Sequence, residues 1–89
     1  MKQIYLLREG SEWTVKVLLD DVKKVRNFVK IIEKSSKRAF LKSGRYEVGA
    51  KSLMGIFALD LMKPIELVLP DGIEDKILNE LKKFEFKGE

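Results

Sequence analysis

The spacing of apolar residues changes repeatedly along this chain, and those changes constrain the fold more than any other feature. Between residues 22 and 32 they recur at intervals of three and four, at Val22, Val25, Phe28, Val29 and Ile32. That spacing places them on one face of a helix. On both sides of this segment apolar residues alternate with polar ones, which is typical of half-buried strands. The chain therefore combines helices and strands.

Turn-forming residues separate these segments. The first long helix should begin after Asp20-Asp21 and end before Ser35-Ser36. We expect strands at 2–8, 13–18, 38–42, 46–48 and 64–69, and further helices at about 52–59 and 73–84. Ser43-Gly44-Arg45 connects two of the strands into a hairpin. This order indicates an α+β fold in which an antiparallel sheet carries helices on one face.

Length and composition limit the remaining possibilities. Eighty-nine residues fit one domain, 1–89, with a modest core. Cysteine and histidine are both absent, and no acidic cluster has the spacing of a calcium loop, so we expect neither a metal nor a cofactor. No apolar run has the length of a membrane span and no signal peptide is visible, so we expect a cytoplasmic protein without a membrane partner. The net charge of +4 is compatible with an acidic partner without identifying one.

The most distinctive motif is Ala50-Lys51-Ser52-Leu53-Met54-Gly55, at the predicted start of the second helix. Ser52 is the natural N-cap there, since its hydroxyl can accept a hydrogen bond from a free backbone N–H group. The run from Lys51 to Ile56, followed by Leu59, resembles the regulatory-serine region of the HPr phosphocarrier family, part of the bacterial sugar phosphotransferase system. The order of elements from Val15 to Phe84 is also similar to that family.

The resemblance implies an HPr-like open-faced β-sandwich, with four antiparallel strands under three helices. The additional strand at 2–8 should pair with the exposed edge of the family's first strand and protect it. The sequence leaves the oligomeric state open. An exposed edge strand and a shortened loop could favour a dimer formed by strand exchange.

The family transfers phosphate through a histidine, which this chain lacks. Counting back from Ser52 by the family's spacing puts Asp21 at the histidine position and Lys23 where the family has an arginine. A carboxylate would need magnesium to relay a phosphoryl group, and no such site is visible. Asp21 is interpreted first as a helix cap, and alternatively as a fixed charge that imitates phosphohistidine. We therefore expect no catalytic residue and no enzymatic activity.

The resemblance implies that a dedicated kinase phosphorylates Ser52. A phosphate there would meet free N–H groups and the positive end of the helix dipole, with Lys51 alongside. The alternative is that Ser52 only caps the helix. In the family the equivalent helix face docks kinases, the phosphotransfer enzyme and regulators.

The partner-binding candidates on this face are Lys23, Lys51, Leu53, Met54 and Phe57. Leu53, Met54, Phe57 and Met62 supply its apolar surface. A short amphipathic helix must bury one stripe, so we expect two of these four side chains in the core. Met54 and Phe57 are the candidates for exposure.

The leading hypothesis is an HPr-like regulatory or binding protein that is not competent as a histidine phosphocarrier. Its partners would be a kinase, a phosphotransferase enzyme or a transcriptional regulator. The family contains a precedent, Crh, which lacks the histidine, keeps the serine and acts in carbon catabolite regulation.

Two alternatives remain open. One is a phosphocarrier that uses another acceptor residue. The other is a module that binds nucleic acid or an acidic protein through basic residues of the first helix, at Lys23, Lys24, Arg26 and Lys30. No recognised DNA- or RNA-binding motif is present, so a solvated basic face is the simpler interpretation.

Overall fold

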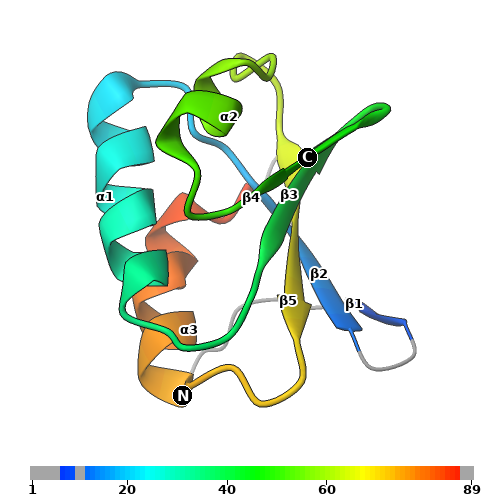
Figure 1. Cartoon of the computed structure of the whole chain (residues 1–89), viewed down its shortest axis with the longest axis vertical. Helices are drawn as coiled ribbons and strands as arrows, with labels where there is room; N and C mark the ends of the chain where they lie inside the picture. Colours follow the sequence, from blue (N-terminus) through cyan, green and yellow to red (C-terminus); the bar gives the residue numbers. More distant parts are fainter. Residues whose placement is uncertain (1–6, 10–11, 87–89) are drawn as a thin grey trace.

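Five strands and three helices form two layers in the computed structural model, which describes residues 7–9 and 12–86. The three helices lie on the same side of the sheet (Figure 1). The strands are β1 (Leu7–Glu9), β2 (Glu12–Val17), β3 (Phe40–Ser43), β4 (Tyr46–Gly49) and β5 (Ile65–Pro70). The helices are α1 (Val22–Glu33), α2 (Leu53–Phe57) and α3 (Asp75–Leu81), which continues into a short 3₁₀ turn, η1 (Lys82–Phe84).

All neighbouring strands are antiparallel, in the order β1-β2-β5-β3-β4. The long ladder between β2 and β5 runs from Glu12↔Pro70 to Val17↔Ile65. The predicted α+β architecture is confirmed, with four antiparallel strands, an additional N-terminal strand and three helices.

The additional strand, β1, pairs with the outer edge of β2 as predicted, from Leu7↔Thr14 to Glu9↔Glu12. The remainder of the predicted strand, residues 2–6, lies outside the described residues. The C-terminal segment covers the other half of this edge. The Leu18 N–H donates to the Phe84 carbonyl (2.9 Å), and the Phe86 N–H donates to the Lys16 carbonyl (2.8 Å). Two short segments thus protect one long edge.

The core lies between the sheet and the helices. The predicted face of α1 is buried at Val25, Phe28, Val29 and Ile32. The prediction is wrong for Val22, which is 55% exposed because it begins the helix and no preceding turn helps to cover it. The sheet contributes alternate residues, which belong to the same cluster: Val15, Val17, Leu41, Leu67 and Leu69.

The hairpin between β3 and β4 turns at Gly44, between the paired residues Ser43 and Tyr46. Gly44 has a φ of +61°. A type II′ turn requires such a value at its first central position, which glycine adopts without strain. Tyr46 begins β4 at the edge of the sheet, and its side chain is 72% exposed.

Candidate functional site

The end of β4 determines where α2 begins. The Ala50 N–H donates to the Ala39 carbonyl (2.9 Å), which holds the chain against the sheet as it leaves the strand. The Ser52 hydroxyl then accepts a hydrogen bond from the Gly55 N–H (3.1 Å). The predicted cap is confirmed, and the Ser52 side chain is exposed. The cap satisfies one of the backbone N–H groups that the start of this five-residue helix leaves without an intrahelical partner.

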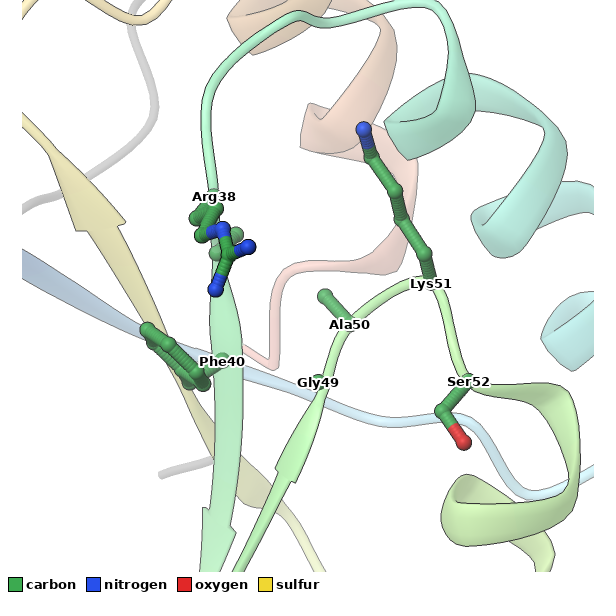
Figure 2. A pocket seen from close by; sticks show the side chains of 7 residues that line it. Arg38, Phe40, Gly49, Ala50, Lys51 and Ser52 are labelled. Carbon is green, nitrogen blue, oxygen red and sulfur yellow. The ribbon is translucent and has the colours of Figure 1, made fainter.

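Lys51 does not lie beside the Ser52 hydroxyl. Figure 2 shows the two side chains pointing in opposite directions from neighbouring positions. The Lys51 ammonium donates to the Ser35 carbonyl (2.9 Å), just past the end of α1. Carbonyl groups at a helix C-terminus carry partial negative charge, which favours a cation there. In this structure Lys51 therefore ties the start of α2 to the end of α1.

An open pocket of about 480 Å³ lies between the start of β3 and the start of α2 (Figure 2). Arg38 and Phe40 line one side, and Lys51 and Ser52 line the other. Sequence patterns do not place Arg38 near Ser52, because the β3–β4 hairpin separates these two residues along the chain. The pocket thus has a cation on one side and the candidate hydroxyl on the other, while the Phe40 ring points away from Ser52 (Figure 2).

A buried serine joins the ends of two helices near this pocket. Ser35 is 2% exposed, and its hydroxyl donates to the Glu74 carboxylate (2.7 Å) at the start of α3. The same oxygen accepts a hydrogen bond from the Lys37 N–H (3.0 Å). The hydrogen bond from Ser35 is the main cause that lowers the pKa of Glu74. Because the Ser35 carbonyl also holds Lys51, this residue connects α1, α2 and α3.

This junction predicts a pH-dependent stability. The folded-state pKa of Glu74 is below its ordinary value of 4.5, so its ionised carboxylate stabilises the fold above that pH. The contribution is lost as the pH falls through the folded-state pKa. In urea unfolding at pH 7 and at pH 3, the wild type should lose more stability on acidification than Glu74→Gln.

Ser35→Ala is the matched control, because it removes the main cause of the shift. In that background the Glu74→Gln substitution should change the pH dependence much less. An equal loss of stability on acidification in wild type and Glu74→Gln would contradict the role of this carboxylate.

Asp21 caps α1, as predicted. Its carboxylate accepts a hydrogen bond from the Lys23 N–H (2.7 Å), and Lys23 itself is exposed. The neighbouring Asp20 forms an ion pair with Lys24 (2.8 Å). This hydrogen-bonded pair lowers the pKa of Asp20 and raises that of Lys24. Among the described side chains, no three acidic residues come together as metal ligands would.

An exposed apolar face surrounds α2. Met54 is 84% exposed and Phe57 is 44% exposed, which confirms both predictions of exposure. The prediction that two of the four apolar side chains lie in the core is wrong, since Leu53 is 38% exposed and Met62 is 77% exposed. A helix of about one and a half turns can turn only a few side chains toward the core. In α2 the buried side chain is that of Ile56, at 0% exposure.

Comparisons with known proteins give a structural match but no sequence family. No protein-family model matches the chain, and no curated protein matches it. Among solved structures, the chain is similar to an HPr-type protein, HPr-C-His from Thermoanaerobacter tengcongensis, with a TM-score of 0.64. The match covers 83% of this chain and 92% of that chain at 24% identity. The chain therefore has an HPr-like fold. None of the helices in the described residues has the length and apolarity needed to cross a membrane.

Proposed function

We propose that this protein is an HPr-like regulator of the phosphotransferase-system type, which binds protein partners and does not carry phosphate on histidine. The observation that carries the proposal is an HPr-like fold in a chain without histidine. At the position where the resemblance puts the histidine, Asp21 caps α1 instead. In this proposal the protein acts by binding in the cytoplasm and has no enzymatic activity of its own.

Phosphorylation of Ser52 by a kinase is the proposed switch. The hydroxyl is exposed at the start of α2, next to the apolar residues Leu53 and Met54. A phosphate would add a charge of about −2 at the border of that apolar face. It would also offer a new partner to the cation on the other side of the pocket, Arg38. Both effects would change which protein surface binds there.

The proposed partner surface combines the exposed apolar residues with nearby cations. Leu53, Met54 and Phe57 supply adaptable apolar contacts, and Lys23 and Lys51 supply positive charge. A kinase, a phosphotransferase enzyme or a transcriptional regulator with an apolar patch bordered by acidic residues would be complementary to this surface.

Intact-mass measurement after incubation with ATP and an HPr kinase tests the proposal. Wild type should gain one phosphate, and Ser52→Ala should gain none. The control Ser36→Ala, which changes an exposed serine outside α2, should be labelled like wild type. Absence of label on wild type would reduce Ser52 to a helix cap and refute the switch.

A parallel incubation with phosphoenolpyruvate and the phosphotransfer enzyme tests the loss of carrier activity. We expect no phosphate on the protein, because neither Asp20 nor Asp21 has a magnesium site beside it in the described residues. Label on either residue would favour the alternative, a phosphocarrier with another acceptor.

A further inference from the structure

The sheet face opposite the helices carries a row of charges that alternate in sign. The cross-strand register places Glu47, Lys42, Glu66 and Lys16 side by side on β4, β3, β5 and β2. Their neighbours along the strands, such as Leu41 and Leu67, are fully buried and face the helices. Because successive side chains in a strand point to opposite faces, these four face away from the helices. We call them the charged row.

Within the described residues, the side chains of the charged row form no ion pair. All four side chains are exposed. In the described part of the chain, none of them lies within 4 Å of an opposite charge, whereas the exposed pairs Lys24–Asp20 and Lys34–Glu80 do. Water hydrates each of these side chains, and an opposite charge on a partner surface can pair with it.

The adjacent row on the same face is less polar. Phe40 on β3 lies opposite Val68 on β5 in the register. Phe40 is half-buried and Val68 is buried at 4% exposure, although no helix of the described residues covers this face (Figure 1). The face therefore combines a charged row with an apolar pair on its two central strands.

This arrangement is complementary to itself. A two-fold axis that runs parallel to the strands, in front of the face and between β3 and β5, exchanges the two central strands. It places Lys42 opposite the partner copy's Glu66 position, and Glu47 opposite the Lys16 position. It also places Phe40 opposite Val68. Every charge in the row meets an opposite charge. Phe40, which is half-buried, supplies the apolar contact, since Val68 is already buried within its own chain.

We infer that this open sheet face binds a second copy of the chain, face to face. Aligned sheets pack about 10 Å apart with a rotation of roughly 30°, so the central strands remain in register while the outer strands diverge. Two residues on each of four strands cover on the order of 300 Å² per copy, which is small for a protein interface. The dimer is therefore weak and sensitive to salt. It does not depend on the proposed function and leaves the α2 surface free.

Sedimentation equilibrium at concentrations up to about 1 mM and at low salt tests this inference. Wild type should show a monomer–dimer equilibrium that weakens as salt is added. Lys42→Glu alone and Glu66→Lys alone should each weaken dimerisation by about tenfold or more, because like charges then oppose each other twice in each homodimer. Controls with the same charge changes on α1, Lys30→Glu and Glu33→Lys, should dimerise like wild type.

The decisive sample is an equimolar mixture of Lys42→Glu and Glu66→Lys. In the mixed dimer every reversed charge meets an opposite charge, so association should return to within about threefold of wild type. The environment inside each chain is the same in the mixture as in the separate variants, so only a contact between copies can produce this rescue. Monomeric wild type, or a mixture no better than its components, would overturn the inference. So would a salt-insensitive dimer, which would indicate strand exchange instead.

Discussion

Replacing Phe28 with alanine should lower the free energy of unfolding by about 3–5 kcal/mol. Phe28 lies in the middle of α1 and is fully buried. Its ring meets that of Phe84 edge to face, with centroids 5.7 Å apart and an interplanar angle of 87°. The substitution removes this contact and leaves a cavity at the centre of the core. It also weakens the segment after Phe84, which pairs with β2.

Urea unfolding followed by circular dichroism measures this effect. Val22→Ala provides the control on the same helix, since Val22 is exposed and its loss should change stability by no more than about 0.5 kcal/mol. A double-mutant cycle with Phe84→Leu isolates the ring contact. The two substitutions should be non-additive, and strictly additive effects would contradict a direct contact between the rings.

Gly55→Ala should destabilise the protein by about 1–3 kcal/mol, although alanine is the better helix former by about 1 kcal/mol. A Cβ at this position would lie 2.9 Å from the Ser52 hydroxyl oxygen and 3.2 Å from the Val48 Cβ. The first contact displaces the N-cap of α2, and the second pushes the helix away from β4. Glycine at position 55 is thus required by the close approach of α2 to the sheet.

Two variants separate these contributions in the same unfolding experiment. Gly49→Ala is the matched control, because a Cβ there meets nothing within 4 Å, and it should leave stability within about 0.5 kcal/mol of wild type. In a Ser52→Ala background, Gly55→Ala should cost less, since one of the two close contacts is gone. An equal cost in both backgrounds would show that Val48 alone resists the new methyl group.

Features fixed by local sequence could be predicted. The buried face of α1, the caps at Asp21 and Ser52 and the Gly44 turn each depend on residues within a few positions of one another. Helical and strand periodicity also gave the correct order of elements. The exposure of all four apolar side chains around α2 could not be predicted in this way. It depends on how little of a five-residue helix the sheet can cover.

Features that depend on distant residues could not be predicted. The Ser35–Glu74 hydrogen bond joins positions 39 apart in the sequence, and Ser35 looked only like the end of a helix. Lys51 was expected beside Ser52, yet the Ser35 carbonyl attracts it to the opposite side. Arg38 reaches the same pocket only because of the hairpin. The candidate site is therefore recognisable in sequence by its serine, while its electrostatics are set by the tertiary structure.

The β2–β5 ladder has a consequence for how the protein is made. It joins residues 12–17 to residues 65–70, and β5 lies between β2 and β3 in the sheet. A ribosome that has released α1 and the β3–β4 hairpin has therefore produced two parts of a sheet whose central strand does not yet exist. Contacts of such long range are the slow ones in folding. Until β5 emerges, the nascent chain presents the inner edges of β2 and β3 unpaired, which is when it most needs protection from aggregation.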